Sequence, residues 1–242
     1  MRKVEELRVA VKKAKLVAFD LDGTLLNTID DLAYACNHTL EVSEYPRRSL
    51  DEVRRFVGNG IPKLIERALP DPVSEEEFDK LVKIFNEYYA EHLWDYTIEY
   101  DGISELIEEF KAQGKTLMVL TNKNEILARQ IVQHFFPGIF VKVLGDNPEK
   151  ELKPDPSYYY EALEELQIDP EDTILIGDSD TDVKTAVNSG AYGIGAEWGY
   201  RNAEVLAENG ADIIIENPRK LLELLRENNC TGTSAKNIHI AN

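Results

Sequence analysis

Three short runs of this 242-residue chain are almost entirely apolar and end in polar residues or glycine, and these runs most constrain its fold. They span residues 16–19, 117–120 and 173–176, and two further runs, 141–144 and 212–215, are similar. A strand with one solvent-facing side alternates apolar and polar residues, whereas continuous apolar runs are typical of strands covered on both faces. The pattern therefore predicts a parallel sheet buried between helices.

Helical patterns separate these runs. Apolar residues recur at helical spacing over 103–110, and Gly114 is placed to end that helix. Pro218 precedes the apolar run 221–225, as proline often does in the first turn of a helix. Strands that alternate with helices favour a doubly wound α/β sheet. From Asn228 onward no periodicity is visible, and we expect this tail to be poorly ordered.

One long stretch breaks the alternation of strands and helices. Residues 27–98 contain no convincing strand, only apolar residues at helical spacing. Ser49 with Glu52, and Ser74 with Glu77, have the spacing of capping boxes, in which the side chain and backbone of the two residues bond reciprocally at the start of a helix. We therefore expect an inserted helical subdomain.

The charge and cysteine content exclude several classes of protein. The formal net charge of −18 opposes binding to the phosphate backbone of nucleic acids. An anionic small molecule needs cations close to its binding site, because salt screens the overall charge beyond about 8 Å. The two cysteines, Cys36 and Cys230, are too few for a disulfide framework. No apolar stretch approaches the roughly 20 residues of a membrane span and no secretion signal is visible, so we expect a cytoplasmic protein without a membrane partner.

The sequence Asp20-Leu21-Asp22-Gly23-Thr24 follows the first predicted strand directly. Ligands of open α/β sheets bind at the carboxyl ends of the strands, so the position of this motif is informative. Residues two apart in an extended chain point the same way, and Asp20 and Asp22 can therefore face one site. An Asp-Gly turn is the alternative interpretation, but a turn does not require two aspartates after a buried strand.

A second acidic motif, Gly-Asp-Ser-Asp-Thr-Asp at 177–182, follows the third apolar run in the same way. Its alternating aspartates resemble a calcium-binding loop, but that loop has glycine at its sixth position and glutamate at its twelfth. Val183 and Ser189 occupy those positions here. A solvent-exposed acidic turn that caps the next helix remains the alternative.

If the two motifs meet at one edge of the sheet, their carboxylates need a cation. Like charges a few ångströms apart raise each other's pKa and oppose a compact site. Oxygen ligands suit a hard ion, and Mg²⁺ typically uses few carboxylates and keeps several waters. The four histidines lie outside both motifs, which leaves little support for zinc. We therefore expect magnesium.

Two further segments carry groups that suit a phosphate. Thr121 and Asn122 follow the second apolar run, and their hydroxyl and amide can bond phosphate oxygens, although a helix cap is an equally good interpretation. Lys153 begins the sequence Lys-Pro-Asp-Pro, whose prolines restrict the loop. Neither cysteine is followed by an arginine six residues later and no Arg-His-Gly triplet occurs, which excludes phosphatases with a cysteine or histidine nucleophile.

Taken together and in this order, the four segments resemble the motifs of the haloacid dehalogenase superfamily of phosphotransferases, and the resemblance covers nearly the whole chain. It implies a Rossmann-like catalytic core of residues 1–26 and 99–242. It also implies an α-helical cap domain, residues 27–98, inserted after the first motif. Asp101 departs from the pattern, because proline is expected before Gly102; this concerns the hinge of the cap and not the chemistry.

The resemblance implies a role for each motif. Asp20 would attack phosphorus and form an aspartyl-phosphate, while Asp22 would protonate the leaving oxygen and then activate water. Thr121, Asn122 and Lys153 would hold the phosphoryl group. The implied catalytic residues are Asp20, Asp22, Thr121 and Lys153, and the implied substrate-binding residues of the core are Gly23, Thr24, Asn122 and Lys123. The implied magnesium ligands are Asp20, the backbone carbonyl of Asp22, Asp178 and, through water or indirect contacts, Asp182.

Within the superfamily, three details resemble bacterial phosphoglycolate phosphatases: the turn Val57-Gly58-Asn59-Gly60, the run Thr121-Asn122-Lys123, and Gly177-Asp178-Ser179 with Asp182. The turn precedes a helical run, so backbone amides near Asn59 and Gly60 can meet a substrate carboxylate. Arg54, Arg55 and Lys63 lie nearby in the sequence and can supply positive charge. A glycine turn with solvent-exposed basic residues is the alternative.

We therefore predict a magnesium-dependent phosphatase of a small phosphate monoester, with 2-phosphoglycolate as the favoured substrate, acting as a monomer or homodimer. Pyrophosphate and other small phosphoesters remain alternatives, because substrate-selecting loops vary most. A phosphomutase of the same superfamily is less consistent with the sequence, because the first motif of phosphomutases usually carries valine at the position of Thr24. A receiver-type signalling module has its phosphorylated aspartate after a later strand and no insert of this size.

Overall fold

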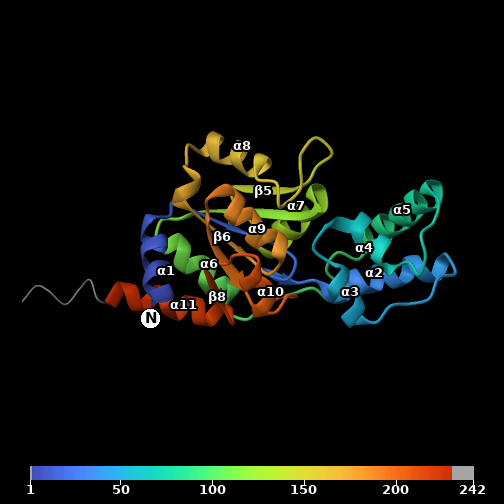
Figure 1. Ribbon diagram of the computed structural model, residues 1–242, viewed down its shortest axis with the longest axis horizontal. Coiled ribbons are helices and arrows are strands. Elements are labelled where there is room, and N and C mark those ends of the chain that lie inside the picture. The colour runs from blue at the N-terminus through green and yellow to red at the C-terminus, as the bar shows by residue number, and fades with distance from the viewer. Residues whose placement is uncertain (1, 231–242) are drawn as a thin grey trace, which may run out of the picture.

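The computed structural model describes residues 2–230, and a six-stranded parallel sheet forms its centre (Figure 1). The strands follow the order β5-β4-β1-β6-β7-β8, and every neighbouring pair is parallel. Their bounds are β1 Leu16–Phe19, β4 Thr116–Asn124, β5 Lys142–Asp146, β6 Thr173–Gly177, β7 Tyr192–Ala196 and β8 Ile213–Ile215. The predicted α/β class is confirmed.

Helices cover both faces of this sheet. In β1, Leu16 and Ala18 pack with residues of α8 and α9, whereas Val17 and Phe19 belong to a second core with α1, α6, α7 and α11. Alternate residues of a strand point to opposite faces, so both sets of positions must be apolar. The helices of this layered part are α1 Arg2–Lys13, α6 Ile103–Ala112, α7 Glu125–Phe135, α8 Ser157–Leu166, the 3₁₀ helix η1 Pro170–Asp172, α9 Asp180–Ser189, α10 Ala203–Glu208 and α11 Pro218–Cys230.

The apolar pattern misses strand β7, whose sequence is Tyr-Gly-Ile-Gly-Ala. Its glycines interrupt the run of apolar side chains. A Cβ at Gly193 would lie 3.0 Å from Ala186 of α9, and one at Gly195 would lie 3.2 Å from Leu206 of α10. The glycines therefore allow two helices to pack closely on the strand, and that same requirement removes its sequence signal.

Helices α2 (Ile29–Val42), α3 (Leu50–Phe56), α4 (Gly60–Ala68) and α5 (Glu75–Glu91) lie together to one side of the sheet and pack on one another (Figure 1). The short strands β2 (Leu26–Asn27) and β3 (Ile98–Glu99) pair antiparallel where the chain leaves the layered part and returns to it. Residues 28–97, all within the described part of the chain, contain no strand.

The two expected capping boxes differ in outcome. Ser49 caps α3 with both reciprocal bonds to Glu52. Ser74 caps α5 by accepting from the backbone N–H of Glu77, but the Glu77 carboxylate accepts a hydrogen bond from the Tyr45 hydroxyl at 2.7 Å instead of turning back to Ser74. The second box is therefore only half formed, because a tertiary partner takes its acidic side chain.

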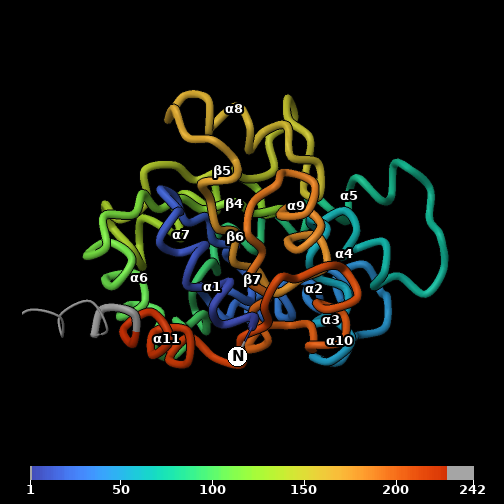
Figure 2. The backbone as a smooth tube through the Cα atoms, turned by 60° about the vertical axis from the view of Figure 1, so that its left-hand side comes forward, coloured from blue at the N-terminus to red at the C-terminus, as the bar shows by residue number. Residues whose placement is uncertain are grey.

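The last described helix corrects the expectation for the tail. Helix α11 continues to Cys230, so the expectation of disorder is wrong for Asn228 to Cys230; residues 231–242 lie outside the described residues. Helix α11 packs against α6 at the end of the molecule away from α2–α5 (Figure 2). A bidentate ion pair from Arg219 to Asp101, the residue found in place of proline, ties α11 to the start of α6. Within residues 2–230, every helix is too short or too polar to cross a membrane.

Candidate active site

The acidic motifs meet at the carboxyl edge of the sheet. Asp20 follows β1 directly, Asp178 follows the neighbouring strand β6, and Thr121 lies in β4 on the other side of β1. Strand β4 continues to Asn124 instead of ending at residue 120, and its register against β5 shifts between Leu120 and Asn124. All three residues are buried. The structure thus brings together residues that lie far apart in the sequence.

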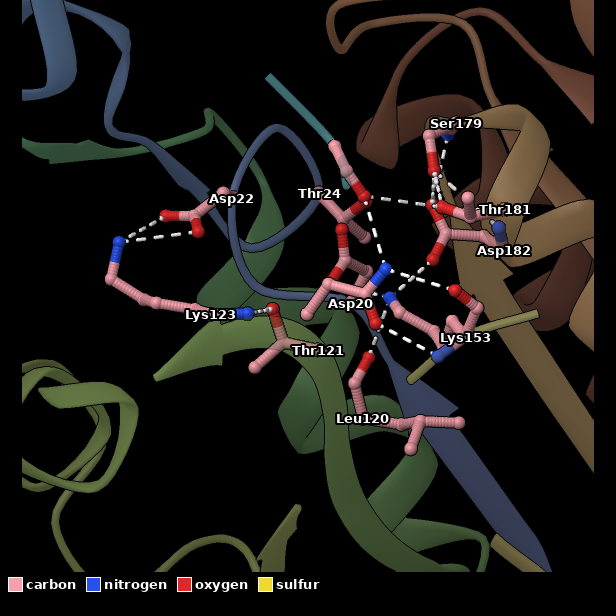
Figure 3. A network of polar contacts seen from close by, with 12 residues as sticks. Asp20, Asp22, Thr24, Leu120, Thr121, Lys123, Lys153, Ser179, Thr181 and Asp182 are labelled. Atoms are coloured by element: carbon pink, nitrogen blue, oxygen red, sulfur yellow. Dashed lines mark hydrogen bonds and ion pairs between the residues drawn. The ribbon is translucent and has the colours of Figure 1, made fainter. Parts of the chain in front are cut away.

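Lys153 links the two acidic motifs (Figure 3). Its Nζ donates to Asp20 Oδ1 at 2.9 Å, to the Leu120 carbonyl at 2.9 Å and to Asp182 Oδ1. An ammonium group has three N–H donors, so all of them are used. Burial lowers the pKa of Lys153, but the charges of Asp182 and Asp20 more than offset it, and the pKa lies above its usual value. The ammonium group is therefore charged.

Three buried carboxylates form a cluster here, and two of them, Asp20 and Asp182, pair with this ammonium group. Asp20, Asp178 and Asp182 each offer an oxygen, and these atoms lie within 4.8 Å of one another. Burial, with the charge of Asp182 in addition, raises the pKa of Asp20 to about 7. Burial and the charges of Asp20 and Asp182 also raise the pKa of Asp178. A buried all-oxygen cluster whose members oppose one another's ionisation fits a hard divalent cation such as Mg²⁺.

Asp182 joins the Lys153 ammonium group to the start of α9, because each of its two oxygens bonds one of them. Oδ1 accepts from Lys153, and Oδ2 accepts from the Ser179 backbone N–H at 2.9 Å and from the Ser179 hydroxyl. The bond from the Ser179 backbone N–H, together with one from the Asp182 backbone N–H to the Ser179 hydroxyl, forms the reciprocal capping box at the start of α9. Asp182 therefore fixes Lys153 and the second acidic motif together.

Asp178 lies between two glycines. Its Oδ1 accepts from the Thr24 hydroxyl at 3.1 Å, and its Oδ2 accepts from the Tyr200 backbone N–H at 2.7 Å. A Cβ at Gly23 would lie 2.4 Å from Asp178 Oδ2, and a Cβ at Gly199 would lie 2.2 Å from Asp178 Cβ. Gly23 and Gly199 are thus required because the carboxylate occupies the space that their side chains would fill.

Replacing Gly199 with alanine is expected to lower the free energy of unfolding by about 3 kcal/mol, since the added methyl group overlaps Asp178 and the backbone of Gly23. Gly114→Ala is the control, because nothing lies within 4 Å of the added Cβ and only the positive φ of 73° opposes it. That control is expected to cost about 1 kcal/mol. Urea denaturation measures the free energy of unfolding of both variants. An equal decrease in the two would contradict the close approach of Gly199 to Asp178.

Asp22 lies apart from the carboxylate cluster and has partners of its own. Its Oδ1 accepts from the Thr28 hydroxyl at 2.7 Å, and Lys123 Nζ lies 2.9 and 3.2 Å from its two oxygens. Lys123 also donates to the Tyr89 hydroxyl of α5 at 2.6 Å. Lys123 thus serves Asp22 in this structure, and a helix of the inserted segment helps to hold it.

A pocket opens beside these groups and is lined by both parts of the molecule. The inserted segment contributes mainly apolar and glycine residues, namely Leu32, Val57, Gly58, Gly60, Ile61 and Leu64. The layered part contributes Asp20, Asp22, Thr121, Asn122, Lys123, Lys153, Asp178, Ser179, Tyr200 and Arg201. The Asn122 amide bridges the two parts, because it donates to the Gly58 carbonyl at 3.1 Å and accepts from the Lys153 backbone N–H at 2.9 Å.

Five of the expected substrate-binding residues are absent from the lining of this pocket, and two of them, Gly23 and Thr24, lie against Asp178 instead. Arg54 and Arg55 are absent from its lining, and Arg54 pairs with Asp51 at 2.9 Å. Asn59 is also absent, and its side-chain oxygen accepts from Arg67 at 2.8 Å. Lys63, expected nearby, pairs with Glu66 on the surface.

Arg201 lines the pocket, and the sequence motifs did not point to it. It lies in the loop after β7, the strand that the apolar pattern missed. Its side chain crosses to the inserted segment and donates to the backbone carbonyls of Arg54 at 2.9 Å and Val57 at 2.6 Å. The position of Arg201 after a strand gave no signal in the sequence, because the glycines of β7 interrupt its apolar run.

Comparisons with known proteins show the family to which the chain belongs. Residues 17–196 match the model of the haloacid dehalogenase-like hydrolases, and the chain belongs to this family of enzymes. The phosphoglycolate phosphatase of Vibrio parahaemolyticus is 34% identical over 218 residues, which cover 87% of this chain and 96% of that protein. The phosphoglycolate phosphatase of Haemophilus influenzae is 31% identical over 219 residues, covering 87% and 98%. A crystal structure of a predicted phosphoglycolate phosphatase from Haemophilus somnus is 31% identical, with a TM-score of 0.82, and covers 88% of this chain and 98% of that one.

Proposed function

We propose that this protein is a magnesium-dependent phosphatase that forms an aspartyl-phosphate on Asp20. The observation that carries the proposal is the position of Asp20 at the carboxyl end of β1, with one oxygen bonded to Lys153 and two further carboxylates beside it. Membership of the hydrolase family and relatives named phosphoglycolate phosphatase support it.

In the proposed reaction, an oxygen of Asp20 forms a bond to phosphorus while the bond from phosphorus to the alcohol oxygen of the substrate breaks. Asp22 gives its proton to that alcohol oxygen. A water molecule then attacks the phosphorus of the aspartyl-phosphate and gives a proton to Asp22, which releases inorganic phosphate and restores both side chains. The covalent step divides one difficult displacement into two easier ones.

The surrounding side chains position these groups. Lys153, Thr121 and Asn122 line the pocket, and in the proposed reaction they would bond the phosphoryl oxygens. Lys153 and Asn122 would exchange N–H donors from their present acceptors to the substrate. Lys123 and Thr28 hold the Asp22 carboxylate in one orientation. Fixed donors around a transferring phosphoryl group stabilise the charge that develops on it, and positioning contributes most of the remaining rate enhancement.

We infer that Asp20, the backbone carbonyl of Asp22 and Asp178 would hold Mg²⁺. Asp182 would act indirectly, since its oxygens are bonded to Lys153 and Ser179. When bound, the ion supplies positive charge that stabilises the phosphoryl oxygens. Its charge also offsets the mutual repulsion that raises the pKa of Asp20 and Asp178.

We further propose that residues 27–98 act as a cap and that 2-phosphoglycolate is the favoured substrate. The cap contributes Val57, Gly58 and Gly60 to the pocket, so it contacts the part of the substrate remote from the phosphoryl group. A short substrate suits a pocket whose cap wall approaches closely enough for Gly58 to bond Asn122. Pyrophosphate and other small phosphoesters are the alternatives.

Phosphate release in the presence of Mg²⁺ is expected to be faster from 2-phosphoglycolate than from the other substrates tested, by about 100-fold in kcat/KM relative to ethyl phosphate. Ethyl phosphate has a methyl group in place of the carboxylate, and a hydrogen bond to a charged group contributes about 1.5–3 kcal/mol. The panel also contains pyrophosphate, sugar phosphates, nucleotides and an aryl phosphate. Weak activity on all of these compounds would support the proposed phosphatase activity but reject 2-phosphoglycolate as the favoured substrate. No phosphate release from any of them would reject the phosphatase activity itself.

A further inference from the structure

Three cationic side chains line the pocket, and they differ in how their charge is compensated. Lys123 pairs with Asp22, and Lys153 pairs with Asp20 and Asp182. Arg201, by contrast, bonds only backbone carbonyls among the residues described. Its positive charge is therefore the one in the pocket wall that no described carboxylate neutralises.

The carbonyl end of helix α3 holds Arg201. Its Nη1 donates to the Arg54 carbonyl at 2.9 Å, and its Nη2 donates to the carbonyls of Arg55 at 3.3 Å and Val57 at 2.6 Å. These bonds use three of the five N–H groups of a guanidinium and leave two for another acceptor. The last carbonyls of a helix carry only partial negative charge, so they orient the guanidinium without compensating a full charge.

The neighbours of Arg201 fix its position relative to the carboxylate cluster. The backbone N–H of the preceding residue, Tyr200, bonds Asp178 at 2.7 Å. A Cβ at Gly58 would lie 3.6 Å from Arg201 Nη2 and 3.9 Å from Ser179 Cβ. The guanidinium therefore lies where the cap turn meets the second acidic motif, on the wall that the proposed substrate would face.

We propose that Arg201 recognises the carboxylate of the substrate and so determines its specificity. The inference rests on the proposed phosphatase function and identifies the residue that distinguishes a phosphorylated hydroxy acid from a neutral phosphoester. A chain with a net charge of −18 needs a local cation to bind a second anionic group, and Arg201 supplies it. Arg54 and Arg55 contribute their backbone carbonyls to this arrangement, not their side chains.

The test compares 2-phosphoglycolate with ethyl phosphate in Arg201→Gln. The kcat/KM for 2-phosphoglycolate is expected to fall about 100-fold, mainly through KM, because a charge-assisted bond to the substrate is lost. The value for ethyl phosphate is expected to change less than about threefold, since no carboxylate is present. Arg201→Lys keeps a positive charge and is expected to recover about tenfold for 2-phosphoglycolate alone. Arg55→Gln is the matched control, and it is expected to preserve the ratio of the two substrates.

Each other outcome overturns the inference in a recognisable way. Equal losses for both substrates in Arg201→Gln, with an unchanged thermal unfolding midpoint, would make Arg201 a structural link between core and cap. Equal kcat/KM values of the wild type for 2-phosphoglycolate and ethyl phosphate would show that the enzyme does not recognise the substrate carboxylate. Failure of the wild type to release phosphate from any phosphomonoester would reject the proposed function itself, and the assignment of Arg201 with it.

Discussion

Asp20→Asn is expected to lower kcat for phosphate release by about 10⁴-fold or more, because an amide cannot act as the nucleophile and removal of a nucleophile costs losses of this order. Asparagine has nearly the same shape and keeps an oxygen that can accept from Lys153. A loss of activity therefore reports on the chemistry and not on the packing around β1.

Asp180→Asn is the matched control for this experiment. Asp180 lies in the same acidic motif as Asp178 and Asp182, but it pairs with Lys184 near the surface and is not part of the carboxylate cluster. Its replacement is expected to change kcat by less than about twofold, as is typical of exposed ion pairs. Near-normal turnover by Asp20→Asn would reject the aspartyl-phosphate mechanism, provided that a continuous assay and mass spectrometry exclude contaminating wild-type enzyme.

Excess chelator is expected to abolish phosphate release, and added Mg²⁺ is expected to restore it fully. The reason is that the negative charges of the three buried carboxylates repel one another, and among the described residues one lysine, Lys153, pairs with them. Retention of full activity in excess chelator would remove the metal from the mechanism. The same cluster predicts an effect on stability, which does not depend on catalysis.

Without metal, the free energy of unfolding is expected to fall as the pH rises from about 4 to about 7. The pKa of Asp20 is about 7 in the folded protein against a usual value of 3.8. Between these values the folded state keeps a proton that the unfolded state has released, so stability falls by at most about 1.4 kcal/mol per pH unit and levels off above the folded pKa. Asp20→Asn removes this titration and also the charge that raises the pKa of Asp178, so the difference between wild type and variant reports on these two neighbouring groups together.

Urea denaturation at several pH values, with chelator and with Mg²⁺, measures the effect. Mg²⁺ favours the ionised carboxylates and is expected to flatten the pH dependence of the wild type. In chelator, Asp20→Asn is expected to be more stable than the wild type above pH 7, because it lacks the buried charge. A wild-type profile identical to that of the variant would contradict the raised pKa of Asp20.

The fold could be predicted from the sequence where burial leaves a pattern. Strands covered on both faces need apolar residues at every position, and the predicted runs correspond to β1, β4, β5, β6 and β8. Strand β7 could not be found in this way, because close packing of two helices requires glycine at Gly193 and Gly195. The partner of Glu77 was equally hidden, since Tyr45 reaches it only in the folded chain.

The site could be predicted where its residues follow directly from strands. Asp20 and Asp178 are placed by β1 and β6, which are neighbours in the sheet. Lys153 lies in a loop, and its bond to Asp20 depends on tertiary packing that no local pattern encodes. Its flanking prolines and its positive charge made it a candidate, but only the family resemblance gave it a role, and the roles of these residues stay predictions until the variants are measured.

The arginine that lines the pocket could not be identified from its distance along the sequence to the glycine turn. Arg54 and Arg55 precede the glycine turn, but Val53 is the buried residue of α3, and its neighbours on the helix point in other directions. Arg201 is far away in the sequence and reaches the same turn from the opposite part of the molecule. Its position follows from a strand that carried no sequence signal.

The chain departs from the layered part through β2 and returns through β3, and these two strands are paired. Paired strands lie about 5 Å apart, so the intervening segment begins and ends at nearly the same point. A longer, shorter or differently folded segment between them need not displace the sheet that holds Asp20 and Asp178. The inserted segment can thus be exchanged during evolution as a module, while the sheet that holds Asp20 and Asp178 is kept.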